Sequence, residues 1–303
     1  MKIAVALPAR PALTLNRVAS YAQLVRPRMG LLVVATTAAG GVLAAKGNPD
    51  WNTLAQTSVA TAMLFAGASA LNQLIERHSD ALMARTADRP LPAGLLAPLE
   101  ALVLGCALAG CGLAALLAAH QLLATALGAF ALVTYVFIYT PLKTRTPHNT
   151  LVGAIPGAMP PLMGWAAGRG ELDSGAAALF LVLLLWQIPH FLAIAWIYRD
   201  EYARAGLRMF PLFDPSGVRT GRQMVAYTLV LISASLMSLT MGRAGWVCAI
   251  GVVTAGAVFL HMTIAFARNR TTENARRVFH VSVVYLAAVI LLFVLEATLH
   301  LGL

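Results

Sequence analysis

Residues 175–197 read "GAAALFLVLLLWQIPHFLAIAWI", a run that contains no acid, lysine or arginine. A helix needs about 20 mostly apolar residues to cross the hydrocarbon core of a bilayer, and this run is long enough to do so. The run is continuously apolar and does not alternate between apolar and polar positions, which favours a helix over a strand of a closed barrel. The stretch therefore predicts a membrane protein built from helices.

Eight further runs of the same kind extend this prediction to the whole chain, in which 59% of the 303 residues are hydrophobic. We expect an all-α integral membrane protein whose residues 1–303 form a single membrane-embedded domain. Residues 1–25 are expected to form a cytoplasmic segment, and they are not predicted to be a signal peptide because they lack its continuous apolar core. The nine predicted spans are 29–45, 54–75, 95–118, 121–140, 150–168, 175–197, 224–241, 244–267 and 279–301.

The net charge of +10 follows the predicted topology. Three basic residues, Lys46, Arg169 and Arg243, fall on one side of the nine spans, and all the other lysines and arginines fall on the opposite side. Basic loops stay in the cytoplasm, so the N-terminus is predicted inside and the C-terminus outside. Since topology explains the basic residues, we do not expect a nucleic-acid partner.

The segment "NQLIERHSDALMARTADRPLP" (residues 72–92) gathers acids and arginines at the cytoplasmic end of the second span. Asn72, Glu76 and Asp80 are spaced by four residues, so on a helix they form one polar stripe about 80° wide. Their oxygen atoms are ligands that suit Mg²⁺, which usually shares its coordination shell with substrate phosphates. The alternative interpretation is a solvated helix end beside arginines that fix topology.

Two other cytoplasmic segments carry matching groups. "YRDEYARAGLRMFP" (198–211) places Asp200 and Glu201 after the sixth span, and "YTPLKTRTPHN" (139–149) follows the fourth. Acids that bind metal and cations that bind phosphate would then face one another, which favours diphosphate chemistry. The predicted diphosphate-binding residues are Arg26, Arg28, Arg85, Arg89, Tyr139, Lys143 and Arg145. Asn72, Glu76, Asp80, Asp200 and Glu201 are the predicted metal ligands and, with Lys143, the predicted catalytic residues.

These motifs resemble the UbiA superfamily of intramembrane prenyltransferases. The spacing of Asn72, Glu76 and Asp80 is similar to its first acidic motif, and Tyr139 and Lys143 match its Y-x-x-x-K element. Four strings resemble its haem O synthase branch, the protoheme IX farnesyltransferases: "NQLIERHSDALMARTADRPLP", "GAIPGAMPPLMGW" (153–165), "WQIPHFLAIAW" (186–196) and "YRDEYARAGLRMFP". The chain departs from that branch in having Asp200–Glu201 where Glu-Asp is expected, which leaves open which carboxylate binds metal.

The resemblance implies nine helices around a central cavity, Mg²⁺ as cofactor, and an active site at the cytoplasmic face of a bacterial inner membrane. It implies transfer of a farnesyl group from farnesyl diphosphate to a vinyl group of haem B through a farnesyl cation, which makes haem O. The implied partners are these two substrates, membrane lipid, and a haem A synthase or an oxidase assembly factor. Nucleic acid is not among them.

Three residues are candidates for contact with haem: His190, His148 and Trp186. His190 follows Pro189 inside an apolar run, where its ring must find a polar partner. That partner is either haem or the backbone carbonyl that Pro189 leaves free, and the sequence keeps both open. Trp186 is a residue type that packing and interfacial belts also use.

Two other functions compete with this one. A related prenyltransferase could use a quinone ring or chlorophyllide as acceptor, and only the resemblance favours haem. A transporter would place its ionisable groups near the middle of the bilayer, between repeats. Here most of the acids lie at the cytoplasmic edge and no repeat is evident, which argues against transport.

Overall fold

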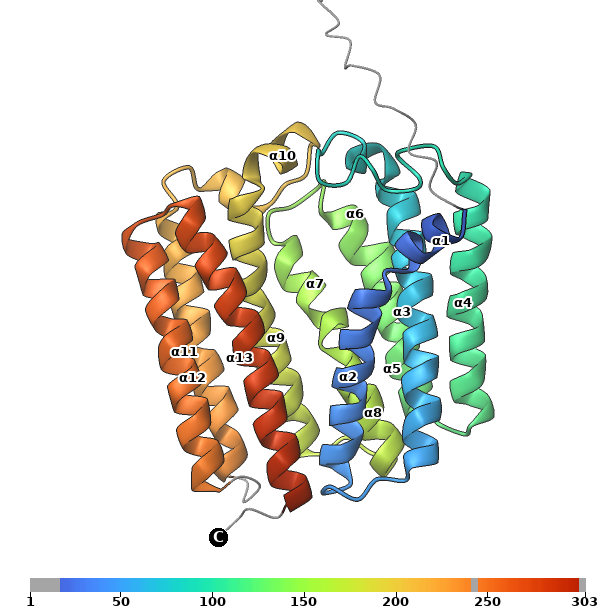
Figure 1. Ribbon diagram of the computed structural model, residues 1–303, viewed down its shortest axis with the longest axis vertical. Coiled ribbons are helices and arrows are strands. Elements are labelled where there is room, and N and C mark those ends of the chain that lie inside the picture. The colour runs from blue at the N-terminus through green and yellow to red at the C-terminus, as the bar shows by residue number, and fades with distance from the viewer. Residues whose placement is uncertain (1–16, 241–244, 300–303) are drawn as a thin grey trace, which may run out of the picture.

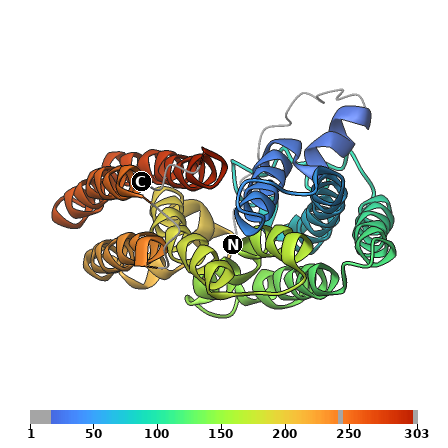
Figure 2. The same ribbon diagram turned by 90° about the horizontal axis from the view of Figure 1, so that it is seen from below.

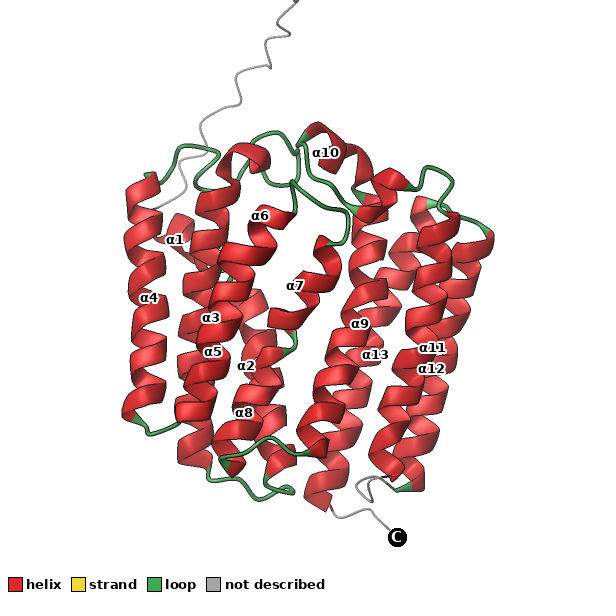
Figure 3. Ribbon diagram, turned by 180° about the vertical axis from the view of Figure 1, so that it is seen from behind, coloured by secondary structure: helices red, strands yellow, loops and turns green. Residues whose placement is uncertain are grey.

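The computed structural model describes residues 17–240 and 245–299, and every regular element in these residues is helical (Figures 1 and 3). The α-helices are α1 (Arg17–Val25), α2 (Pro27–Ala44), α3 (Trp51–Asp80), α4 (Pro98–Ala118), α5 (Leu122–Val133), α6 (Thr140–Leu142), α7 (Asn149–Gly157), α8 (Met159–Arg169), α9 (Ser174–Ile197), α10 (Arg199–Arg204), α11 (Val218–Thr240), α12 (Trp246–Arg268) and α13 (Thr272–Leu299). A π-helix, η1 (Thr134–Tyr139), joins α5 to α6, and a 3₁₀-helix, η2 (Phe210–Phe213), follows α10.

The prediction of a helical membrane protein is confirmed, and the number of nine spans is approximate. In the described part of the chain, seven helices are long and apolar enough to cross a membrane. The predicted span 150–168 is divided into α7 and α8, each too short to count alone. The predicted span 224–241 corresponds to α11, which begins earlier with the polar turn "VRTGRQ" and is less apolar than its neighbours. The chain is thus a multi-pass integral membrane protein.

The break between α7 and α8 has a local cause. Pro156 lies inside α7, and Pro160 and Pro161 open α8, so several backbone N–H donors are missing where a continuous helix would need them. The backbone of α8 packs directly on α2: a Cβ added to Gly164 would lie 1.9 Å from the carbonyl oxygen of Thr37. Because only glycine permits this approach, Gly164 fixes the position of α8.

Seen from below, α11, α12 and α13 lie on one side of the molecule and α2 to α5 on the other, with α7, α8 and α9 between them (Figure 2). A large apolar core joins α9, α11, α12 and α13, and its buried aromatic residues are Trp196, Phe259, Phe266, Tyr285 and Phe293. The polar links that follow α3, α6 and α9 lie together at one end of the bundle, the upper end in Figure 1. The predicted acids and cations are therefore all at this end or close to it.

Candidate functional site

Glu76 and Lys143 form an ion pair at the end of α3. The Nζ atom of Lys143 lies 2.6 Å from Oε1 of Glu76, and the two side chains are 15% and 11% exposed. The same ammonium group lies 4.5 Å from the centroid of the Tyr139 ring. Burial acts to lower the pKa of Lys143, but the Glu76 carboxylate outweighs it and raises that pKa above its usual value. Lys143 therefore keeps its positive charge in a largely enclosed position.

Asp80, one turn further along α3, pairs with Arg89. Nη1 of Arg89 lies 2.6 Å from Oδ2 of Asp80, which is 1% exposed. The pKa of Arg89 is lowered, first by burial and then by the neighbouring charge of Arg26. Arg26 itself sits at the junction of α1 and α2 with a left-handed backbone (φ 51°). Asp80 is therefore surrounded by the cations of the 81–97 link, which joins α3 to α4, and of the α1–α2 junction.

Asn72 is buried and bonds to the segment that carries Lys143. Its Nδ2 donates to Oγ1 of Thr140 at 2.9 Å, and that hydroxyl donates to the carbonyl of Tyr135 at 2.8 Å. Tyr135 and Tyr139 belong to η1, and π-helical turns of this kind occur frequently at functional sites. Two members of the predicted stripe, Asn72 and Glu76, thus both reach the η1–α6 segment.

The structure places the two acids of α10 differently. Glu201 accepts a hydrogen bond from the backbone N–H of Arg85 at 3.1 Å, and the Arg85 guanidinium donates to the Tyr202 hydroxyl at 3.1 Å. Asp200 is 85% exposed and pairs with its neighbour Arg199 at 3.7 Å. Glu201 therefore faces the 81–97 link, whereas Asp200 faces away from it.

The oxygen ligands needed for a magnesium ion are available, although they do not form a ready-made cage. Among residues 17–240 and 245–299, no three side chains of Asp, Glu, His or Cys lie close enough together to hold a metal ion. Glu76 and Asp80 each contact a cation of the chain instead. Mg²⁺ commonly uses one or two carboxylates and takes its other ligands from water and substrate phosphates. The residues therefore fit a metal that arrives with a diphosphate.

The remaining predicted diphosphate contacts lie at the same end of the bundle. Arg28 is exposed near the start of α2, and Arg145 is exposed in the link between α6 and α7. His148, a predicted haem contact, is also exposed in that link. Tyr139 lies against α7, where a Cβ added to Gly153 would be 2.4 Å from its ring.

His190 and Trp186 form a separate cluster between α9 and α13. Nδ1 of His190 lies 2.7 Å from Oγ of Ser282, and Nε1 of Trp186 donates to the carbonyl of the same serine at 2.5 Å. The His190 ring stacks on Trp186 at 4.8 Å and lies 5.0 Å from Phe279. The polar partner of His190 in this structure is thus a serine hydroxyl, which the sequence did not suggest.

Sequence reasoning missed four residues that hold the site together. Thr140 lies inside the "YTPLK" string and Tyr202 directly follows the acid pair, so their positions could have been noted. Asn149 and Arg208 connect two links through hydrogen bonds, and no local pattern marks them.

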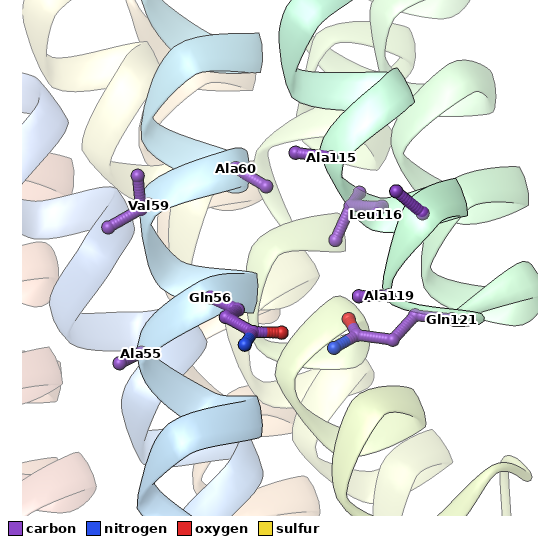
Figure 4. A pocket seen from close by; sticks show the side chains of 9 residues that line it. Ala55, Gln56, Val59, Ala60, Ala115, Leu116, Ala119 and Gln121 are labelled. Carbon is purple, nitrogen blue, oxygen red and sulfur yellow. The ribbon is translucent and has the colours of Figure 1, made fainter.

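The cavity drawn in Figure 4 is not part of this site. It has a volume of about 550 Å³ and lies between α3 and α4, near the end of α3 opposite to Asp80. Small apolar residues line it, together with the amides of Gln56 and Gln121, and no charged side chain does. A diphosphate would find no counter-charge there.

Comparison with known proteins gives consistent matches over most of the chain. The model of the UbiA prenyltransferase family matches residues 33–294. The chain is 41% identical over 285 residues to a protoheme IX farnesyltransferase of Solibacter usitatus, covering 91% of the chain and 98% of that relative. It is 39% identical over 276 residues to a protoheme IX farnesyltransferase of Salinibacter ruber, again covering 91% and 98%.

Two solved structures have the same fold. A digeranylgeranylglyceryl phosphate synthase superimposes with a TM-score of 0.78 at 16% identity, covering 94% of this chain and 99% of the other. A UbiA homologue from Archaeoglobus fulgidus bound to GPP and Mg²⁺ superimposes with a TM-score of 0.62 at 17% identity, covering 90% and 99%.

Proposed function

The chain belongs to the UbiA prenyltransferase family, and we propose on this basis that it transfers the farnesyl group of farnesyl diphosphate to a vinyl group of haem B, which makes haem O. The observation that carries the proposal is the match to protoheme IX farnesyltransferases at 41% and 39% identity over nine-tenths of the chain. The charged site at the end of α3 supports it, because it combines carboxylates with arginine and lysine.

Lys143, Arg89 and Arg85 bind the diphosphate in this proposal. An ammonium acts on phosphate oxygens as a point charge, while a guanidinium can donate two hydrogen bonds at once. As the bond to the farnesyl carbon breaks, negative charge grows on the departing diphosphate, so these cations stabilise the transition state more than the bound substrate. Arg26, Arg28, Arg145 and Tyr139 are the further candidates for this role.

We assign the metal ion to Glu76, Asp80 and Glu201, with Asn72 beside them. Asp200 is the weaker candidate, because its carboxylate is exposed and faces away. Mg²⁺ is the expected ion, since the donors are hard oxygen atoms and a fold relative is bound to GPP and Mg²⁺. When bound, it would offset negative charge on the diphosphate.

The farnesyl cation is attacked by the vinyl group, and water then adds to the remaining cation and releases a proton, which leaves a hydroxyethylfarnesyl side chain. The face of the Tyr139 ring, already 4.5 Å from an ammonium, suits contact with such a cation. We assign haem contact to His190 and Trp186, with His148 as a further candidate. The His190 ring contacts three aromatic side chains, those of Trp186, Phe191 and Phe279, and this cluster supports a flat apolar ligand nearby.

The basic links support a cytoplasmic N-terminus, an external C-terminus and a site at the cytoplasmic face of a bacterial inner membrane. In this proposal residues 1–303 act as one membrane-embedded domain, and a haem A synthase or an oxidase assembly factor receives the product.

The test is a reaction of the purified protein in lipid with farnesyl diphosphate and Mg²⁺, offered haem B, a quinone ring and chlorophyllide in separate incubations. We expect a product only from haem B, with the mass of a farnesyl group and a hydroxyl group added. A product from the quinone ring alone would refute haem B as the acceptor, although it would still support prenyltransferase activity. No product from any acceptor would refute the proposed activity.

A further inference from the structure

Asn149 connects two links of the site through its side-chain amide. It is the first residue of α7, and it is 0% exposed. Its Nδ2 donates to the carbonyl of Thr146 at 2.7 Å and to the carbonyl of Arg208 at 2.8 Å. The backbone N–H of Arg208 in turn donates to the carbonyl of Lys143 at 2.6 Å. Both backbone polar groups of Arg208 are therefore bonded to the segment 143–149.

The backbone N–H of Lys143 makes a long hydrogen bond within its own turn. It follows α6, a helix of three residues. Its backbone N–H reaches the carbonyl of Thr140 at 3.4 Å, and the next N–H reaches the carbonyl of Pro141 at the same length, both longer than an ordinary hydrogen bond. The hydrogen bond from the backbone N–H of Arg208 is thus much shorter than the one that the backbone N–H of Lys143 makes within its own turn.

From this geometry we propose that Asn149 is a positioning residue: it holds Arg208, and through Arg208 it holds Lys143 where its ammonium meets the diphosphate. The inference rests on the proposed function in one respect, the role of Lys143 in diphosphate binding. Asn149 touches no reacting group, so its effect reaches the substrate only through Lys143.

The amide acts through its N–H₂ group alone. Oδ1 of Asn149 is buried and has no hydrogen-bond partner among the described residues. Asn149→Asp keeps the shape but replaces the donors by an oxygen that faces two carbonyl oxygens. Asn149→Ala removes the donors without adding a charge, so it is the variant used in the test.

The test measures binding of pyrophosphate in excess Mg²⁺ by titration calorimetry, which gives the stoichiometry and the dissociation constant separately. We expect Asn149→Ala to raise the dissociation constant about 5–10-fold at unchanged stoichiometry, the effect of losing two hydrogen bonds that act on Lys143 indirectly. A purely structural role would instead lower the stoichiometry and leave the dissociation constant of the folded fraction unchanged. That result would overturn the inference.

Two further variants make the test specific. Thr150→Val removes a neighbouring buried hydroxyl that has no partner among the described residues, and it should leave pyrophosphate binding unchanged. In a Lys143→Ala background, Asn149→Ala should add no further loss, because the group it positions is gone. An equal loss in both backgrounds would overturn the inference while leaving the diphosphate site intact. A wild-type protein that fails to bind pyrophosphate would refute the proposed diphosphate site itself.

Discussion

Replacing Glu76 by glutamine should separate its two roles, as a metal ligand and as the partner of Lys143. The carboxamide keeps the size of the side chain but carries no charge for Mg²⁺. We expect turnover to fall roughly 100-fold at saturating Mg²⁺, comparable to losing one strong electrostatic contact in a transition state. The ion pair is 2.6 Å long and only 11–15% exposed, so its loss should also cost about 3–5 kcal/mol of folding stability, because it leaves the buried ammonium of Lys143 without its partner.

The same substitution should strengthen the binding of pyrophosphate when no metal ion is present. In the wild type, Glu76 competes with phosphate oxygens for the ammonium of Lys143. Without that carboxylate, the variant should bind metal-free pyrophosphate more tightly, by roughly 5–10-fold or about 1–1.4 kcal/mol. Calorimetry with and without Mg²⁺ measures both effects on one sample. Glu273→Gln is the matched control, since Glu273 also pairs with an arginine, Arg277, but on the exposed first turn of α13.

Two results would refute this reasoning. Turnover of Glu76→Gln close to that of the wild type at saturating Mg²⁺ would remove Glu76 from the metal site. Weaker binding of metal-free pyrophosphate would show that Glu76 supports Lys143 rather than competing for it.

Three further outcomes are expected. Glu201→Gln should lower turnover much more than Asp200→Asn, because only Glu201 faces the 81–97 link. Steady-state kinetics of the two variants test this, and equal small losses would show that the metal site lies elsewhere. Lys143→Ala should lower kcat and raise KM for farnesyl diphosphate, so that kcat/KM falls on the order of 100-fold while the binding of haem B is unchanged. His190→Ala should instead weaken the binding of haem or alter the spectrum of the bound haem. A reporter after Leu303 should lie outside the cytoplasm and one within residues 202–220 inside it, and both on one side would contradict the topology.

Much of the fold could be predicted because a bilayer demands long apolar runs. The runs 175–197 and 54–75 correspond to α9 and α3, with ends displaced by a few residues. The division at Ala158 was not predicted, although Pro156, Pro160 and Pro161 were visible, because prolines in membrane helices often cause only a kink.

The site was predictable in its residue types and less so in its contacts. A spacing of four residues placed Asn72, Glu76 and Asp80 on α3, but it could not assign Lys143 to Glu76 and Arg89 to Asp80. Adjacent residues such as Asp200 and Glu201 point in different directions on a helix, so the sequence could not decide between them. The bond from Asn149 to Arg208 joins segments 59 residues apart and leaves no local pattern.

The ion pairs Glu76–Lys143 and Asp80–Arg89 affect how the enzyme would release pyrophosphate after the reaction. Pyrophosphate is a strong ligand, and a pocket of bare cations would hold it after each turnover. In this chain Glu76 pairs with Lys143 and Asp80 pairs with Arg89, each at 2.6 Å. Both acids can therefore form these ion pairs again as pyrophosphate dissociates. The acids that bind the metal ion would then also pair with Lys143 and Arg89 again at the end of each cycle, which helps pyrophosphate to leave.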